Sequence, residues 1–243
     1  MNEWEKHLSS DLKVYRPAER EILSDYLELI RAHNDCPEVL LYNFTRVVRT
    51  QEITKLLVFH HIFQQILTVT GSIVEAGVLE GNTLFAFGHM SEIFEHRNYT
   101  RRIYGFDSFE GYNLPNGHRI EPFSFELLER AVQLFNRAIS FNQFERISLV
   151  KGDPGQTVAQ FVSERPYFTC ALLILHVGLY EAERCMLEAV WPRMPKGGVV
   201  LLGGFGYEGT PQCTKVIDDT IGLGNVKIQR LPFATKYCFI TKS

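Results

Sequence analysis

The sequence predicts an α/β protein with a mainly parallel sheet, preceded by a helical segment. From residue 72 onward, short runs of aliphatic and β-branched residues alternate with segments of helical spacing. That alternation is typical of parallel strands joined by helical crossovers. The last two predicted strands are joined only by residues 231–235. Because so short a connection cannot hold a crossover helix, these two strands should pair antiparallel.

A helical extension is expected over residues 1–70, and the sheet domain over residues 71–243. Pro17 stands near the start of one expected helix with acidic residues close behind it, an arrangement that favours a helix N-terminus. A second helix is expected over residues 51–67, where apolar residues recur at helical spacing. We expect this extension to act as a lid on the sheet domain.

The strands are predicted from short apolar runs, of which Ile73 and Val74 are the first example. Seven strands are expected, at residues 72–76, 102–107, 146–151, 170–176, 198–203, 225–230 and 236–241. Helices are expected between them at residues 82–95, 124–139, 155–164, 181–191 and 212–222. A parallel sheet that ends in one antiparallel strand fits the class I methyltransferase arrangement better than a dehydrogenase sheet.

The composition excludes several classes of protein. A chain of 243 residues with 45% hydrophobic residues and a formal net charge of -3 gives no reason to expect nucleic acid or an anionic membrane as a partner. No signal peptide is visible, and no apolar run approaches the roughly eighteen residues of a membrane span. The five cysteines are scattered without a CxxC pair, which indicates reduced thiols. We therefore expect a cytoplasmic protein.

The most informative stretch is residues 72–83, which reads as a strand, a tight turn and a helix start. Gly77 and Gly81 bracket the turn, where glycine permits positive φ and close approach of a ligand to the backbone. Asn82 or Thr83 can cap the helix that follows. Turns of this kind hold nucleotides in α/β folds.

Acidic residues at three strand ends suggest which nucleotide binds. Asp107 ends the second strand and can accept both ribose hydroxyls. Asp153, which follows Gly152 after the third strand, can accept a hydrogen bond from an adenine amino group. Glu75 ends the first strand, where a carboxylate can face a cationic amine or sulfonium.

A nicotinamide dinucleotide is the competing ligand. Its fingerprint is G-x-G-x-x-G, in which the first two glycines cradle a pyrophosphate. Here Gly77 and Gly81 are separated by three residues, and Glu80 lies inside the turn. A carboxylate at that place would repel a pyrophosphate but is compatible with the cationic S-adenosylmethionine. We therefore expect S-adenosylmethionine as cofactor and S-adenosylhomocysteine as product.

The segments at residues 44–51, 71–81 and 102–111 together resemble the macrocin-type O-methyltransferases. These enzymes methylate sugar hydroxyls of natural products, and relatives act in polysaccharide and secondary-metabolite pathways. The resemblance implies a class I fold with a helical N-terminal lid. It also implies a set of cofactor-binding positions, to which we add the helix start and a histidine after the fourth strand: Glu75, Gly77, Gly81, Asn82, Thr83, Asp107, Ser108, Gly152, Asp153 and His176.

The chain departs from that family where the family binds a divalent metal, usually magnesium. The family has acidic residues at the ends of its fourth and fifth strands. This chain has His176 and Gly178 at the first place, and Gly203 and Gly204 at the second. Magnesium needs oxygen ligands, and one histidine is not a zinc site. We therefore expect no metal site.

Methyl transfer can proceed without a metal if a base removes the proton of the acceptor hydroxyl. His176, at a central strand end, is the candidate base, because its ordinary pKa is near 6.5; the alternative is a hydrogen-bonded histidine without a catalytic role. Tyr180 is a second catalytic candidate. Glu181, Tyr207 and His118 are candidates for binding the acceptor, although a solvated surface also accounts for these residues.

Two functions remain open from the sequence. The first is metal-independent O-methylation of a sugar or another small hydroxylated metabolite, by an enzyme that could form a homo-oligomer. The second is a cofactor-binding scaffold or partner protein that has lost methyl transfer. The intact glycine turn favours the first function, and the loss of the metal-binding acids favours the second. Arg46 and Arg49 are further candidates, for the cofactor carboxylate.

Overall fold

The computed structural model describes residues 25, 27–33, 35–115, 117, 119–139 and 145–243. The chain divides into two compact units, Met1–Thr54 and Lys55–Ser243. The described part of the first unit contains α3 (Pro37–Tyr42), α4 (Phe44–Val47) and the start of α5 (Thr50–Ile66). The start of the helix predicted from Pro17 lies outside the described residues, but residues 25 and 27–31 of its later part are helical. Helix α5 matches the helix predicted over residues 51–67.

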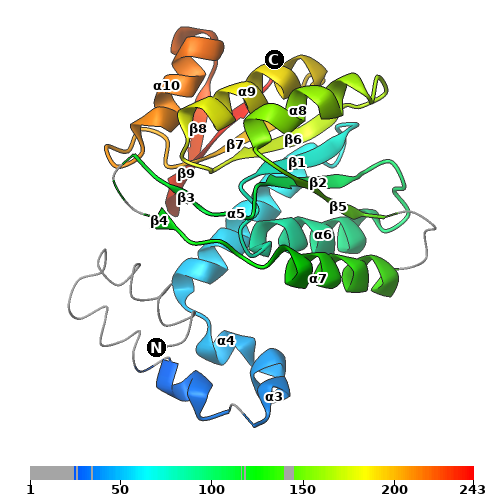
Figure 1. Ribbon diagram of the computed structural model, residues 1–243, viewed down its shortest axis with the longest axis vertical. Coiled ribbons are helices and arrows are strands. Elements are labelled where there is room, and N and C mark those ends of the chain that lie inside the picture. Colours follow the sequence, from blue (N-terminus) through cyan, green and yellow to red (C-terminus); the bar gives the residue numbers. More distant parts are fainter. Residues whose placement is uncertain (1–24, 26, 34, 116, 118, 140–144) are drawn as a thin grey trace. The chain divides into compact units, whose positions relative to one another are not determined.

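The second unit contains the predicted sheet (Figure 1). It has seven strands in the order β5-β2-β1-β6-β7-β9-β8. The strands are β1 (Ser72–Ala76), β2 (Ile103–Asp107), β5 (Ile147–Lys151), β6 (Cys170–Leu175), β7 (Val199–Gly203), β8 (Ile228–Leu231) and β9 (Ala234–Thr241). The first five are parallel to one another, and β9 pairs antiparallel with both β7 and β8. The predicted fold class, with its antiparallel last strand, is confirmed.

Helices cover both faces of the sheet (Figure 1). One face packs against α5, α6 (Asn82–Glu95) and α7 (Phe125–Ala138), and the other against α8 (Pro154–Ser163), α9 (Tyr180–Val190) and α10 (Pro211–Thr220). The central strand β6 shows why: Leu172 and Ile174 join the first core, whereas Leu173 and Leu175 join the second. Successive strand residues point to opposite faces, so a strand buried on both faces is apolar throughout. No helix in the described part of the chain is long and apolar enough to cross a membrane.

A small hairpin lies between β2 and α7 and was not predicted. It consists of β3 (Tyr112–Asn113) and β4 (Arg119–Ile120), which pair antiparallel. Strands of two residues leave no apolar alternation in the sequence, so their composition resembles that of a surface loop. Short 3₁₀ helices at Trp191–Arg193 and Leu223–Asn225 complete the described elements.

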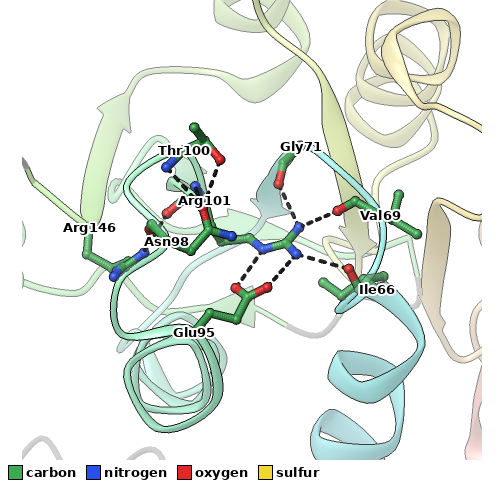
Figure 2. Close-up of polar contacts among 8 residues, drawn as sticks. All are labelled: Ile66, Val69, Gly71, Glu95, Asn98, Thr100, Arg101 and Arg146. Carbon is green, nitrogen blue, oxygen red and sulfur yellow. Dashed lines mark hydrogen bonds and ion pairs between the residues drawn. The ribbon is translucent and has the colours of Figure 1, made fainter.

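The amino ends of β1, β2 and β5 are joined by two buried arginines (Figure 2). Arg101, 2% exposed, pairs both oxygens of Glu95 at 2.7 and 2.9 Å. Its remaining donors bind the backbone carbonyls of Ile66, Val69 and Gly71 at 2.7–3.0 Å. The Arg146 guanidinium in turn donates to the Arg101 carbonyl at 3.1 Å. This network ties the end of α5 and the end of α6 to the start of the sheet.

Candidate functional site

The carboxyl ends of the central strands bring three predicted site residues together. Glu75 is on β1, Asp107 ends the neighbouring β2, and His176 follows β6 on the other side of β1. Glu75 is 1% exposed and Asp107 is 5% exposed. Buried carboxylates at this edge of a parallel sheet are unusual outside ligand sites, so this edge is the candidate site.

The two glycines of the turn after β1 adopt the positive φ values that were predicted for them. Gly77 and Gly81 have φ values of 85° and 83°, in the region that favours glycine. A Cβ on Gly77 would lie 3.2 Å from the Val177 side chain, and one on Gly81 would lie 2.7 Å from Leu128. The predicted capping by Asn82 or Thr83 is wrong: Gly81 is the N-cap of α6, no side chain caps it, and Asn82 is the first helical residue.

The Asp107 side chain binds the backbone of two loop residues that have positive φ. Its carboxylate accepts backbone hydrogen bonds from Leu79 at 3.0 Å and from Phe109 at 2.8 Å. Both residues have positive φ, 51° and 61°, which costs a non-glycine residue energy and is common at functional sites. Each carboxylate oxygen has a second lone pair, which a ribose hydroxyl can use. Asp107 thus shapes the loop after β1 as well as standing where the ribose is expected.

The residues predicted to flank the nucleotide lie beside Asp107. Gly152, with φ 132°, donates its N–H to the Asp107 carbonyl at 2.9 Å. The Asp153 side chain caps α8, accepting from the Gly155 N–H at 2.8 Å. The Ser108 hydroxyl accepts from Glu110 N–H at 3.3 Å. The other Asp153 oxygen stays available, so its contact with adenine remains a prediction.

His176 lies directly over Glu75. Its Nε2 is 2.8 Å from the Gly77 carbonyl oxygen and 3.0 Å from Glu75 Oε1. Because a carbonyl oxygen only accepts hydrogen bonds, Nε2 carries a proton in this arrangement. Nδ1 makes no hydrogen bond to the described residues, so it is the nitrogen left for other chemistry.

The pKa values of this pair follow from burial and mutual attraction. Burial raises the pKa of Glu75 above its ordinary value, and His176 and Thr83 oppose this only in part. For His176, burial is the largest influence and lowers the pKa. The hydrogen bond and charge of Glu75, together with the Gly77 carbonyl, outweigh burial, so the pKa of His176 is raised. The arrangement therefore favours an imidazolium beside a carboxylate.

Three side chains hold the loop that carries His176. Tyr112 donates its hydroxyl hydrogen bond to the Val177 carbonyl at 2.7 Å. Gly178 donates its N–H to Glu183 Oε1, and its carbonyl accepts from Gln212, both at 2.8 Å. Glu183 is 1% exposed, and burial raises its pKa. Sequence reasoning missed Tyr112 and Glu183, because nothing in the sequence marks either side chain as buried at this edge.

The glycines at the positions of the missing metal acids are closely surrounded by other side chains. A Cβ on Gly178, which has φ 78°, would lie 2.8 Å from Leu114. A Cβ on Gly203 would lie 3.0 Å from the His176 Cβ. Gly204 has φ 84°, and a Cβ there would collide with the Thr210 hydroxyl, which donates to the Gly204 carbonyl. Within the described residues no three His, Cys, Asp or Glu side chains are grouped as metal ligands. The four positions themselves therefore supply no carboxylate ligand for a magnesium ion.

The remaining candidates lie around α9 and α10. Tyr180 donates its hydroxyl hydrogen bond to Asp219 at 2.6 Å, which raises the tyrosine pKa. Glu181 is exposed and pairs with Arg184 at 2.7 Å. Among the described residues no interaction joins Tyr180 to His176. His118 lies outside the described residues.

Tyr207 is 64% exposed and lies in an open groove of about 430 Å³ beyond the end of β7. The groove is lined by Gly206, Tyr207, Glu208, Pro211, Thr214, Lys215 and Asp218. An exposed tyrosine beside charged side chains can stack on an apolar sugar face while its neighbours bind hydroxyl groups.

Residues 33–227 match the family model of macrocin O-methyltransferases (TylF). No protein of curated function matches the sequence. Two solved structures of CalS11 are similar to this chain. The first, described as a calicheamicin methyltransferase, has 25% identity and a TM-score of 0.87, and the match covers 93% of each chain.

The second is described as an apo TDP-rhamnose 3′-O-methyltransferase of calicheamicin biosynthesis. It has 27% identity and a TM-score of 0.83 over 93% of this chain and 95% of that one. The O-methyltransferase NovP, at 18% identity and a TM-score of 0.63 over 79% and 80% of the two chains, shows likeness of fold alone.

Proposed function

The chain belongs to the macrocin O-methyltransferase family and is an S-adenosylmethionine-dependent O-methyltransferase, and we propose that it methylates a hydroxyl of a small sugar-containing acceptor without a bound magnesium ion. One observation carries the metal-free part. Of the four positions that would supply the metal acids, one is His176 and three are glycines whose Cβ sites lie close to Leu114, His176 and Thr210.

The cofactor half of the proposed site consists of Glu75, Gly77 and Asp107. The buried Glu75 carboxylate would bind the ammonium group of the cofactor, and Asp107 would accept the ribose hydroxyls. Gly77 gives the ligand access to the backbone, where a side chain would collide with Val177. Asp153 remains the proposed partner of the adenine. The predicted role of residues 1–70 as a lid stays a prediction.

The acceptor half is proposed at the groove that contains Tyr207. A sugar is the proposed acceptor because CalS11, the similar protein described above, is a TDP-rhamnose methyltransferase. The exposed ring of Tyr207 and the charged groups of Glu208, Lys215 and Asp218 suit a hydroxylated ligand. Glu181, His118 and the formation of a homo-oligomer remain proposals without further support.

His176 is the proposed base. Bound S-adenosylmethionine supplies an electrophilic methyl group on a sulfonium, which leaves as a neutral thioether. The protein then has to align the acceptor oxygen with that methyl group and take up the hydroxyl proton. His176 follows β6 directly at the carboxyl edge of the sheet, and its Nδ1 makes no hydrogen bond to the described residues. The Tyr180 hydroxyl proton is directed to Asp219, which makes Tyr180 the weaker candidate.

The proposal is tested by incubating the protein with S-adenosylmethionine and TDP-rhamnose and measuring S-adenosylhomocysteine, with magnesium and with chelator. We expect turnover that the chelator leaves unchanged, and a His176→Ala variant that loses most of it. Turnover that depends on magnesium would overturn the metal-free proposal. Cofactor binding without turnover on any sugar nucleotide would instead support the alternative of a cofactor-binding scaffold.

A further inference from the structure

Glu75 is a buried carboxylate whose capacity to accept hydrogen bonds is only partly used. Both of its oxygens are buried and lack a well-aligned hydrogen bond from the described residues, although the Thr83 hydroxyl and the His176 imidazole both lie close enough to lower its pKa. An isolated buried carboxylate is costly unless a cation is paired with it. The cation next to Glu75 is the protonated imidazole of His176, with Nε2 3.0 Å from Oε1.

The His176 side chain is closely packed between two glycines. Its imidazole lies against Gly77, whose Cβ would come 3.6 Å from His176 Cδ2. Gly203 leaves space on the other side, because a Cβ there would lie 3.0 Å from the His176 Cβ. The histidine at 176 and the glycine at 203 therefore fit each other. The loop that follows is held by Tyr112 and Glu183.

His176 also stands between Glu75 and solvent. The His176 side chain is 23% exposed, whereas that of Glu75 is 1% exposed. A ligand that enters from the carboxyl edge of the sheet would meet the imidazole before the carboxylate. The cofactor's ammonium group and the imidazolium would need the same carboxylate, and their charges repel each other at that distance.

We propose that His176 is a built-in competitor of the cofactor: it occupies Glu75 in the free protein, and S-adenosylmethionine binds only when its ammonium group displaces the imidazole. This inference rests on the proposed cofactor site. Displacement leaves His176 beside a cation instead of a carboxylate, which favours its neutral form. The histidine that closes the empty site is thus turned into a free base once the cofactor has bound.

The charged groups around His176 and Glu75 determine whether cofactor binding releases or takes up a proton. Glu75 faces His176 from β1 and Glu183 faces it from α9, and both favour the imidazolium. Asp107 on β2 acts on Glu75, and Tyr112 on β3 is a neutral phenol because burial raises its pKa. If the imidazolium is displaced and becomes neutral, cofactor binding releases a proton. Affinity then rises with pH until the cofactor's own amino group, with a pKa of about 8, deprotonates.

The test is calorimetric titration with S-adenosylhomocysteine, which carries the ammonium group without the reactive methyl. We expect His176→Ala to bind it about tenfold more tightly than the wild type near pH 7. A difference of that size corresponds to a wild-type protein in which Glu75 is free of His176 about one tenth of the time. Titrations in buffers of different ionisation enthalpy should show release of up to about one proton per cofactor by the wild type. His176→Gln, which keeps an N–H donor without the charge, should release none.

His61→Ala on α5 is the matched control, because His61 is exposed and hydrogen-bonds only Gln65 among the described residues; it should bind like the wild type. Circular dichroism and melting curves verify that each variant is folded. If the wild type binds but His176→Ala binds equally or more weakly, or if His176→Gln still releases a proton, His176 is no competitor and the inference is wrong. If neither the wild type nor His176→Ala binds S-adenosylhomocysteine, the proposed cofactor site fails as well.

Discussion

The two edges of the sheet bury charge in opposite ways. At the amino edge, the Arg101 guanidinium binds Glu95 and the backbone carbonyls of Ile66, Val69 and Gly71. At the carboxyl edge, the Glu75 carboxylate is equally buried but has only the single nearby cation of His176. Both groups are charged and both lie at strand ends, but only the first has all of its hydrogen-bonding capacity in use.

The difference separates a structural site from a functional one. A buried ion pair that is fully hydrogen-bonded fixes the elements it joins, and removal of one partner leaves the other uncompensated. A buried acid with raised pKa and spare acceptor capacity costs stability and is common at binding sites. We therefore expect substitutions at the amino edge to lower stability, and substitutions at the carboxyl edge to change binding instead.

Arg101→Met is expected to have the largest effect. The substitution leaves the Glu95 carboxylate and several backbone carbonyls buried without their donor, which for a buried ion pair costs about 3–5 kcal/mol. The free energy of unfolding from urea denaturation measures this loss. The variant could be too unstable to purify, in which case Glu95→Gln, which keeps the side-chain shape and one acceptor, should show a smaller loss in the same direction.

Arg97→Met is the matched control for Arg101→Met. Arg97 lies on the same connection after α6 but is exposed, so its replacement should change stability by no more than about 0.5 kcal/mol. Equal losses from both arginine variants would contradict the comparison, because they would show that the buried network contributes nothing specific.

Glu75→Gln should separate binding from stability at the other edge. The amide keeps the shape of the side chain but removes the charge that the cofactor's ammonium group is proposed to need. A hydrogen bond to a charged group contributes about 1.5–3 kcal/mol, so affinity for S-adenosylhomocysteine should fall by at least about tenfold. The melting temperature should not fall, because the costly buried charge is removed as well.

Calorimetry and a melting curve on the same Glu75→Gln preparation provide the measurement. Arg101→Met or Glu95→Gln serves as the converse case, with lower stability and retained affinity. A Glu75→Gln variant that melts well below the wild type but binds the cofactor normally would show that Glu75 is structural, and the two edges would then not differ in kind.

The sheet was predictable because its strands are buried on both faces. A run such as residues 170–175 is apolar throughout, and its length and flanking residues separate it from a helix. The antiparallel last strand followed from the short connection after residue 231. The β3–β4 hairpin was not predictable, since two-residue strands have no pattern, and the cap of α6 was mispredicted because the backbone of Gly81 replaces a side-chain cap.

The candidate site was predictable only as a set of positions. Strand ends of a parallel sheet lie at one edge, so Glu75, Asp107 and His176 could be grouped from the sequence. Their interactions could not, because they depend on close packing with residues far along the chain, such as Gly203, where a Cβ would lie 3.0 Å from the His176 Cβ. Glu183 gave no signal, because a glutamate in the first turn of a helix is usually exposed.

Glu183→Gln is expected to have the smallest effect and the opposite sign to Arg101→Met. Burial raises the pKa of Glu183, so the folded state holds this proton more tightly than the unfolded state does. The stability linked to that proton is fully present below the unfolded pKa and is lost as pH rises through the folded pKa. Glutamine does not titrate, and its oxygen can still accept the Gly178 N–H.

The stability of Glu183→Gln relative to the wild type should therefore increase with pH, from no gain near pH 4 to about 1 kcal/mol near neutrality. Urea denaturation at several pH values measures the trend. Glu188→Gln, on the exposed side of α9, should show no such rise. A relative stability that falls with pH would mean that the Glu183 carboxylate is stabilised as an anion by the Gly178 loop. The carboxyl edge would then be as fully satisfied as the amino edge, and the contrast between them would be lost at this residue.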